Sequence, residues 1–325
     1  MKKTKILVSI LLVLLASPFL FAGGQEEATM GGGEFAVGFV PRAFVSVYFV
    51  TMADAVKEAA DANPNIEVQI VAPVDQKDVE GQIKIIEDLT QKKVDLLAVS
   101  VNDPKAVVPS LQEAQDQGIP VIILDAITPL PGIDVLSLIG SNNEDGGEIV
   151  GKTVLELQKK LGRKIKMAIL EGVPGQYANE MRMKGFRSVV QGNPNVEIVA
   201  SQPANWQREL AMSTMENILQ ANADIDLVWG VNDGMALGAL KAVTDAGLND
   251  SILVLGYNGD KEAVEAVEQG MMYSTILQQP AEIGRQVIRI AEMIRTGKKD
   301  QVESLYTIPI VDVRQNNAAK WMPAK

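Results

Sequence analysis

From residue 34 onward, short apolar runs rich in β-branched residues alternate with longer amphipathic stretches. Each short run has the length of a buried strand, and each longer stretch has the length and periodicity of a helix. Strands that alternate with helices of this length form βαβ units, so the sequence predicts an α/β fold with parallel sheets. The expected strands cover residues 35–40, 66–71, 94–101, 119–124, 135–139, 165–170, 196–201, 225–231, 252–257 and 272–277.

The helix-like stretches between the runs carry start and stop signals. Asp103-Pro104 offers a capping carboxylate before a proline at the first helical position. About ten strands exceed what one compact doubly wound domain of ordinary size holds, so we expect two Rossmann-like lobes. The expected helices cover residues 47–62, 78–92, 104–117, 144–160, 176–191, 207–221, 234–246, 261–269 and 281–296, and four of them are followed by a glycine suited to a helix C-terminus, namely Gly118, Gly247, Gly270 and Gly297.

The first residues have the layout of a secretory signal peptide. A basic start precedes an apolar run over residues 6–21 and a pair of small residues. The run is nearly long enough for a membrane-spanning helix, but the proline near its end and the small residues after it favour cleavage. We expect residues 1–22 to be a signal peptide for export to the periplasm and residues 23–33 to be a flexible spacer.

The chain contains no cysteine and no histidine. These absences remove disulfides, thiolate nucleophiles, cysteine zinc sites, a lipidated cysteine anchor, and the commonest general base and metal ligand. The net charge of −11 argues against nucleic acid as a partner. The glycines form neither a dinucleotide-binding fingerprint nor a phosphate-binding loop. We therefore expect no enzyme activity, no cofactor and no metal.

In parallel α/β sheets, ligands bind beyond the carboxyl ends of the strands, so residues at those ends are the first candidates for a site. They are rich in amides, carboxylates and aromatic rings, and they lack a clustered nucleophile and base. Amide and carboxylate groups match the hydroxyls of a sugar, and rings cover its apolar face. The candidates at or just after strand ends are Arg42, Phe44, Tyr48, Ser100, Asp125, Trp206, Asn232, Tyr257, Asn258 and Gln278.

Three stretches of the second half resemble a known family. SQPANWQRE (201–209), VWGVNDGMALGALKAV (228–243) and VLGYNGD (254–260) look like segments of the periplasmic sugar-binding proteins related to ribose-binding protein. The resemblance extends over residues 35–313 and implies two Rossmann-like lobes, joined by three hinge segments, that close over a ligand. The related repressors begin with a DNA-binding helix-turn-helix, and here the apolar leader stands in its place. The implied lobes are residues 34–140 with 279–307, and residues 141–278 with 308–325.

The resemblance also implies roles for individual residues. Trp206 falls where the family has a ring stacked on the sugar, and Tyr48 falls where it has a second ring, with Phe44 in the same loop. The residues that match polar binding positions are Asp125, Asn232, Asn258 beside Tyr257, and Gln278, with Ser100 at a position that is often asparagine.

The chain departs from the family pattern at its arginines. The family's arginine beside the Asp125 position is Ala126 here. The first loop is closer to a branch of the family that has a basic residue after the proline and resembles rhamnose-binding and autoinducer-2-binding proteins. We therefore expect Arg42 in this loop to supply the cation instead. A second family arginine aligns with Glu180, although Arg182 lies close and a shift of register stays open.

Simpler interpretations stand beside these roles. Trp206 could cover the edge of a core, Asp125 could be a turn residue, and Arg42 could pair with a surface carboxylate. In the Asn232-Asp233 pair, we assign helix capping mainly to Asp233 and ligand contact to Asn232.

The sequence therefore predicts an extracytoplasmic solute-binding protein. It would capture a small sugar or polyol-like ligand by hinge closure. By the resemblance, it would be a monomer that delivers this ligand to the permease of an ABC importer. Three alternatives stay open: a nucleoside or autoinducer ligand, a role in sensing, and a glycosidase with Asp125 and Glu180 as its two acids.

Overall fold

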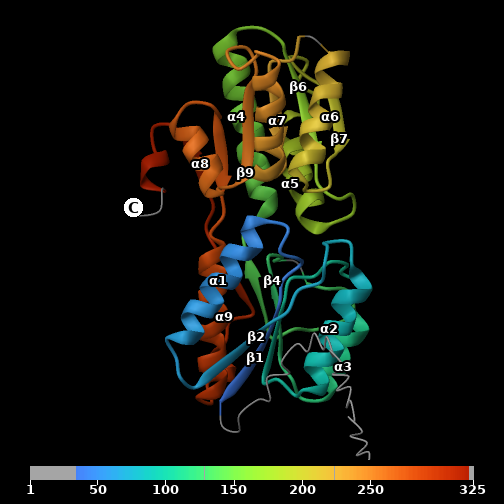
Figure 1. The fold of residues 1–325 in the computed structure, drawn as a ribbon, viewed down its shortest axis with the longest axis vertical. Coiled ribbons are helices and arrows are strands. Elements are labelled where there is room, and N and C mark those ends of the chain that lie inside the picture. Colours follow the sequence, from blue (N-terminus) through green and yellow to red (C-terminus); the bar gives the residue numbers. More distant parts are fainter. Residues whose placement is uncertain (1–33, 128, 223, 322–325) are drawn as a thin grey trace, which may run out of the picture. The chain divides into compact units, whose positions relative to one another are not determined.

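The computed structural model describes residues 34–127, 129–222 and 224–321. The expected signal peptide and spacer lie outside the described residues. The described chain forms two lobes, and each lobe is built on a six-stranded sheet. Figure 1 shows the helices that cover these sheets. The predicted α/β fold with two lobes is confirmed.

The first lobe contains an all-parallel sheet. Helices α1 and α9 pack together on one side of it, and α2 and α3 lie on the other side (Figure 1). The strands, in their order across the sheet, are β11 (Leu305–Thr307), β5 (Ser137–Gly140), β4 (Val121–Leu124), β3 (Leu96–Val99), β1 (Phe35–Val40) and β2 (Ile66–Ile70). The helices are α1 (Val47–Asp61), α2 (Val79–Gln91), α3 (Val108–Asp116) and α9 (Pro280–Arg295).

The second lobe repeats this plan, with one antiparallel strand, β12, at its edge. Helices α4 and α5 pack against each other, as do α6 and α7, and α8 packs against β10. The strands, in order, are β12 (Val311–Arg314), β10 (Ser274–Leu277), β9 (Leu253–Asn258), β8 (Leu227–Gly230), β6 (Ile165–Glu171) and β7 (Val196–Pro203). The helices are α4 (Asn143–Leu161), α5 (Tyr177–Val190), α6 (Arg208–Ala221), α7 (Asp233–Asp245) and α8 (Lys261–Glu268).

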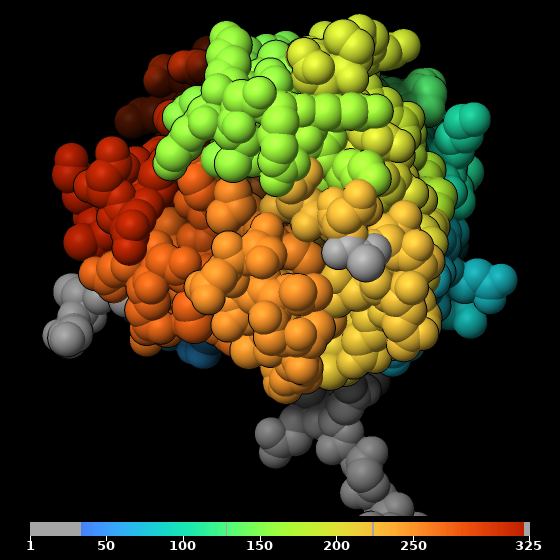
Figure 2. Space-filling view, turned by 90° about the horizontal axis from the view of Figure 1, so that it is seen from above, coloured from blue at the N-terminus to red at the C-terminus, as the bar shows by residue number. Residues whose placement is uncertain are grey.

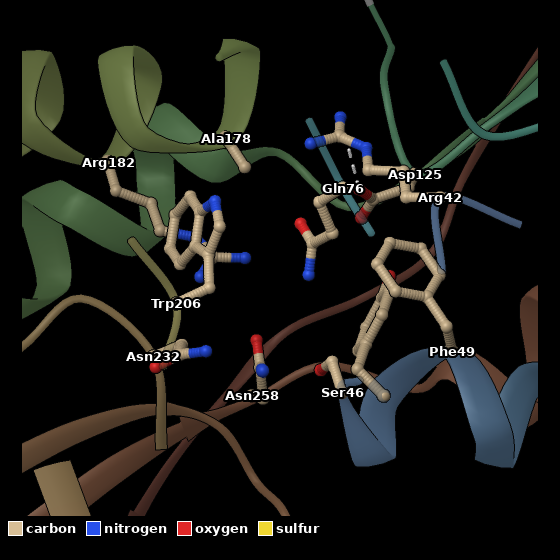
Figure 3. A pocket seen from close by; sticks show the side chains of 11 residues that line it. Arg42, Ser46, Phe49, Gln76, Asp125, Ala178, Arg182, Trp206, Asn232 and Asn258 are labelled. Atoms are coloured by element: carbon tan, nitrogen blue, oxygen red, sulfur yellow. Dashed lines mark ion pairs between the residues drawn. The ribbon is translucent and has the colours of Figure 1, made fainter. Parts of the chain in front are cut away.

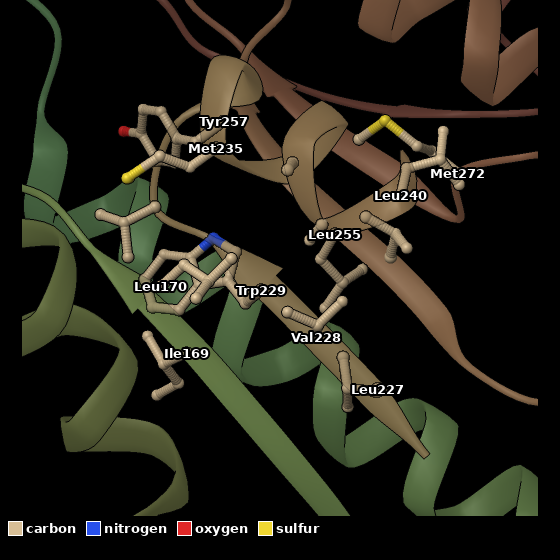
Figure 4. Packing of buried hydrophobic residues seen from close by; sticks show 14 of the residues in the cluster. Ile169, Leu170, Leu227, Val228, Trp229, Met235, Leu240, Leu255, Tyr257 and Met272 are labelled. Atoms are coloured by element: carbon tan, nitrogen blue, oxygen red, sulfur yellow. The ribbon is translucent and has the colours of Figure 1, made fainter. Parts of the chain in front are cut away.

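The core of the second lobe is an apolar layer on its sheet. Trp229 and Tyr257 are fully buried there, and Figure 4 shows them among Leu170, Met235 and other aliphatic side chains. Viewed from above in Figure 2, the surface at this end is formed mainly by second-lobe segments, coloured green to orange. A core of large, interdigitating side chains makes the lobe a rigid support for the loops at its strand ends.

Both sheets have the same strand order, which fixes where a ligand can bind. The first strand of each lobe, β1 or β6, lies between the second strand and the third. In each sheet, the connection after the first strand leads toward one edge, and the connection after the third strand leads toward the other edge. The crevice between these two connections, at the carboxyl ends of the strands, is the usual ligand site of such sheets.

The chain passes between the two sheets three times: after β5, after β10 and after β11. Hydrogen bonds hold these segments together, because Ile308 N–H donates to the Gly140 carbonyl (2.8 Å) and the Gln279 amide donates to the Pro309 carbonyl (3.0 Å). The three connections therefore run side by side.

Some local expectations were wrong. The third helix begins at Val108, because Asp103 accepts hydrogen bonds from the N–H groups of Lys105 and Ala106 and so caps a turn that precedes the helix. Strands β11 and β12 were missed in the sequence. The four C-terminal glycines were predicted correctly, since each has a positive φ.

No helix among residues 34–321, apart from the two positions left out, is long and apolar enough to cross a membrane. In the same residues, no group of histidine, cysteine, aspartate or glutamate side chains is arranged to hold a metal ion.

Helices α4 and α5 approach each other more closely than side chains would allow. An added Cβ at Gly185 would overlap the carbonyl oxygen of Glu144, and one at Gly147 would overlap the carbonyl oxygen of Arg182. Glycine is therefore required at both positions by backbone contact.

We predict that Gly185→Ala lowers the free energy of unfolding by about 1–3 kcal/mol, because the two backbones must move apart. Gly234→Ala is the matched control, since its Cβ would lie 3.7 Å from the nearest atom and alanine favours a helix. Urea denaturation of both variants tests this, and equal midpoints would contradict the close packing.

Candidate functional site

A pocket lies where loops at the carboxyl ends of the two sheets face each other (Figure 3). The space free of protein atoms there is about 320 Å³, part of which is open to solvent. Its lining brings together six of the predicted residues: Arg42, Tyr48, Asp125, Trp206, Asn232 and Asn258. Five more residues complete it: Ser46, Phe49, Gln76, Ala178 and Arg182.

The first-lobe wall is built around an ion pair between Arg42 and Asp125. An Arg42 Nη2 atom lies 3.6 Å from Asp125 Oδ2, and both residues are only 3% exposed. Burial lowers the pKa of Arg42, and the negative charge of Asp125 acts against this shift. The interpretation of Arg42 as the partner of a surface carboxylate is therefore wrong.

Several buried polar atoms on this wall have no partner among the described residues. They are Arg42 Nε, the Tyr48 hydroxyl and Asp125 Oδ1. Burial raises the pKa of Tyr48 well above its usual value, and the charge of Asp125 raises it further, so the phenol is neutral and able to donate. A buried polar group without a partner costs about 1–3 kcal/mol, so this wall is suited to a ligand that supplies the partners.

On the second lobe, the Trp206 indole is fixed by a hydrogen bond. Its Nε1 donates to the Gln176 side-chain oxygen (2.7 Å), and the Gln176 amide nitrogen donates to the backbone carbonyl of Gln76 on the first lobe (3.2 Å). Trp206 packs on the second-lobe core and also lines the pocket, so it does more than cover a core edge.

Arg182 projects from α5, and Figure 3 shows its guanidinium directed toward the pocket. Its Nε donates to Asn143 Oδ1 (2.8 Å) and its Nη1 donates to the Val231 carbonyl (2.7 Å). Its Cζ atom lies 3.7 Å from the centre of the Tyr257 ring, which holds the guanidinium from a third direction. Burial raises the pKa of Tyr257 to about 12, although the charge of Arg182 acts against this shift.

Glu180 lies outside the pocket. It is exposed and accepts hydrogen bonds from the Gly175 N–H (3.1 Å) and the Asn179 amide (3.4 Å). Of the two positions that the register left open, the structure brings Arg182 to the pocket.

The roles within the Asn232-Asp233 pair differ from the expectation. Asn232 caps α7, since its Oδ1 accepts the Met235 N–H (2.8 Å). Asp233 is buried and joins two other segments, accepting the Thr275 hydroxyl (2.7 Å) and the Asp260 N–H (2.7 Å). The assignment of capping to Asp233 was wrong, and the Nδ2 end of Asn232 still lines the pocket.

The remaining predicted residues do not line the pocket. Phe44 is 46% exposed, and Ser100 is fully buried with its hydroxyl unpartnered. Tyr257 lies against Arg182. Gln278 is buried and donates to Asn258 Oδ1 (3.0 Å), so it supports a lining residue from outside.

Of the five residues that complete the lining, only Arg182 was named in the sequence analysis, as the alternative to Glu180, and the other four had weak sequence signals. Gln76 follows edge strand β2, and applying the strand-end rule to this strand too would have found it. Ser46 and Phe49 flank Tyr48 in the first loop and helix α1, where both aromatic rings reach the pocket. Arg182 and Ala178 lie within helix α5, where no strand-end rule applies.

Backbone strain is concentrated around the pocket. Of the five described non-glycine residues with positive φ, four lie in these loops: Asp125 (67°), Asn205 (52°), Trp206 (65°) and Asn258 (129°). Such conformations cost about 1–3 kcal/mol each and are typical of functional sites.

Comparison with known proteins agrees with this geometry. The family described as "Periplasmic binding protein domain" matches residues 37–299. The ribose import binding protein RbsB of Bacillus subtilis is 30% identical over 302 residues, which are 92% of this chain and 95% of that protein.

Two solved structures are also similar. A solute-binding protein from Actinobacillus succinogenes with bound D-allose is 32% identical with a TM-score of 0.81, covering 88% of this chain and 99% of that one. A solute-binding protein from Bacillus halodurans with bound myo-inositol is 27% identical with a TM-score of 0.80, covering 90% and 99%.

Burial raises the pKa of Asp233 from 3.8 to about 6, with Asp260 adjacent. The folded state therefore binds more protons than the unfolded state between about pH 4 and 6, and stability falls as the pH rises through this window. We predict that, as the pH rises from 4 to 7, the free energy of unfolding of Asp233→Asn increases by about 1–3 kcal/mol relative to that of the native chain, because the variant has no proton to lose at this position. Urea denaturation at several pH values tests this, with exposed Asp54→Asn as the control, and parallel pH profiles would contradict it.

Proposed function

The chain belongs to the periplasmic binding protein domain family, and on this premise we propose that it captures a small sugar or polyol in the pocket between its lobes. The protein then delivers that ligand to the permease of an ABC importer. The protein is a solute-binding protein and not an enzyme.

The observation that carries the proposal is the set of buried, unpartnered polar atoms beside aromatic rings. Asp125 can accept from a hydroxyl, while Arg42 and Tyr48 can donate to hydroxyl or ring oxygens. On the opposite lobe, the Trp206 ring offers a flat face for the C–H side of a sugar. A polar pocket with a few aromatic walls is the composition that a carbohydrate requires.

The mechanism that fits this arrangement is hinge closure. We place the hinge at the three connections, with residues 34–140 and 279–307 as one lobe and residues 141–278 and 308–325 as the other. Each lobe holds part of the polar set, so a ligand gains its full set of contacts only when the lobes close.

The ligands of similar proteins support the chemical class. Relatives are named for ribose and D-allose, and similar structures hold D-allose and myo-inositol. These are rings that carry several hydroxyl groups. We further propose export to the periplasm through residues 1–22 and function as a monomer.

Hydrolysis of a glycoside does not fit the pocket. A glycosidase of the usual kind needs two carboxyl groups roughly 5–9 Å apart across the substrate. Asp125 is the only carboxylate among the described residues that line the pocket, and Glu180 lies outside it.

We predict that one class of sugar or polyol raises the melting temperature of the chain from residue 23 onward. A ligand at 100 times its dissociation constant stabilises by about 2.7 kcal/mol, which a thermal-shift screen detects readily. Asp125→Asn and Trp206→Ala should abolish the shift, because they remove a hydroxyl acceptor and the stacking face.

Asp250→Asn and Trp321→Ala are the matched controls, as both residues lie outside the pocket lining and Trp321 is 36% exposed. The controls should retain the shift. A response to nucleosides alone would overturn the sugar assignment, and an unchanged shift in Asp125→Asn would place the ligand elsewhere.

A further inference from the structure

The charges that line the pocket do not balance. Two guanidinium groups, Arg42 and Arg182, face a single carboxylate, Asp125, and every other lining side chain is neutral. Asp125 is paired with Arg42. The pocket therefore holds one positive charge in excess.

The excess charge belongs to Arg182. This residue is 3% exposed, yet it makes no ion pair with any carboxylate in the described part of the chain. Its protein partners are the Asn143 amide oxygen, the Val231 carbonyl and the rings of Tyr257 and Trp206, all of them neutral. A buried charge is stable only when it is matched, so this arginine lacks a counter-ion.

The two guanidiniums also act on each other across the pocket. The charge of Arg182 contributes to the lowered pKa of Arg42, behind the larger effect of burial. Occupation of the space between them by a neutral molecule would leave this repulsion in place.

Two acids outside the pocket do not supply the missing charge. The charge of Arg182 does reach Asp260, but burial and the neighbouring Asp233 raise the pKa of Asp260 well above its usual value and so favour its neutral form. Asp260 lines the wider opening beside the pocket. Asp145 is exposed to solvent, and no ion pair joins it to Arg182 in the described part of the chain.

We propose that the ligand is a polyhydroxylated monocarboxylic acid, such as an aldonate or uronate, whose carboxylate binds Arg182. This inference rests on the proposed function and narrows its ligand class. The hydroxyls bind Asp125, Tyr48 and Asn232, and Trp206 covers the apolar face. A planar carboxylate matches the geometry of a guanidinium.

The excess of one charge favours a carboxylate over a phosphate. A phosphate monoester carries about −1.5 to −2 charges at neutral pH, which would replace a positive excess by a negative one. A carboxylate carries a single charge and leaves the occupied pocket neutral.

The test compares matched ligands by calorimetric titration at neutral pH. The pairs are D-glucose with D-glucuronate, D-galactose with D-galacturonate, and ribitol with D-ribonate, and D-glucose 6-phosphate is the dianionic arm. We expect the acid of at least one pair to bind at least about tenfold more tightly than its neutral partner, and the sugar phosphate to bind more weakly than that acid.

Asn258→Asp tests the charge argument, because it adds a carboxylate to the pocket lining with little change in shape. It should weaken binding of the acid by at least about tenfold and leave the neutral partner less affected. Asn249→Asp, at an exposed position, makes the same change in net charge away from the pocket and should change neither affinity. Arg182→Gln should abolish the preference for the acid.

Tighter binding of the neutral partner in every pair would overturn the inference and leave the proposed function standing. An unchanged preference in Asn258→Asp, or tighter binding of the sugar phosphate than of any acid, would also overturn it. Absence of binding by every sugar, polyol and acid would reject both the inference and the proposed function.

Discussion

The buried ion pair between Arg42 and Asp125 is the constraint around which the pocket is arranged. Taking two charges out of water costs several kcal/mol for each ion, and a single contact at 3.6 Å offsets only part of that cost. The pair forms across the carboxyl end of the sheet, because Arg42 follows β1, Asp125 follows β4 and β3 lies between them. Both residues line the pocket, and Arg42 Nε and Asp125 Oδ1 are left without a partner.

Such a site requires stiff supports, and the two lobes supply them. The α4–α5 contact depends on glycines whose backbones touch, and the second-lobe sheet is covered by large, fully buried side chains. Trp206 and Asn258 have strained backbone conformations in loops of this second lobe, and Asp125 has one in the first lobe. Strain of this kind persists only when the surrounding structure determines it, so the packing around each loop also fixes where its pocket-lining side chains lie.

The sequence predicted well what depends on periodicity and poorly what depends on local geometry. Ten strands and nine helices follow from runs of apolar residues, whereas β11 (LYT) and β12 (VDVR) are too short and too polar to show such a run. Asp125 and Trp206 were found because they follow strands. Arg182 could not be found in that way, because it lies within a helix and reaches the pocket only through the length of its side chain. Capping was assigned to Asp233 because both residue types cap helices well, whereas Asn232 both caps α7 and lines the pocket.

The division of the site between two lobes links recognition to movement. The first lobe contributes Arg42, Tyr48 and Asp125 to the pocket lining, and the second contributes Arg182, Trp206, Asn232 and Asn258, so each lobe carries only part of the lining. Within the lining and its supports, the lobes are joined directly by the hydrogen bond from Gln176 to Gln76. One such bond contributes only about 1 kcal/mol to holding the two walls together. A ligand that bonds to both walls adds several contacts at once, and each of them exists only in the closed arrangement. The free energy of binding is therefore also the free energy that selects the closed form.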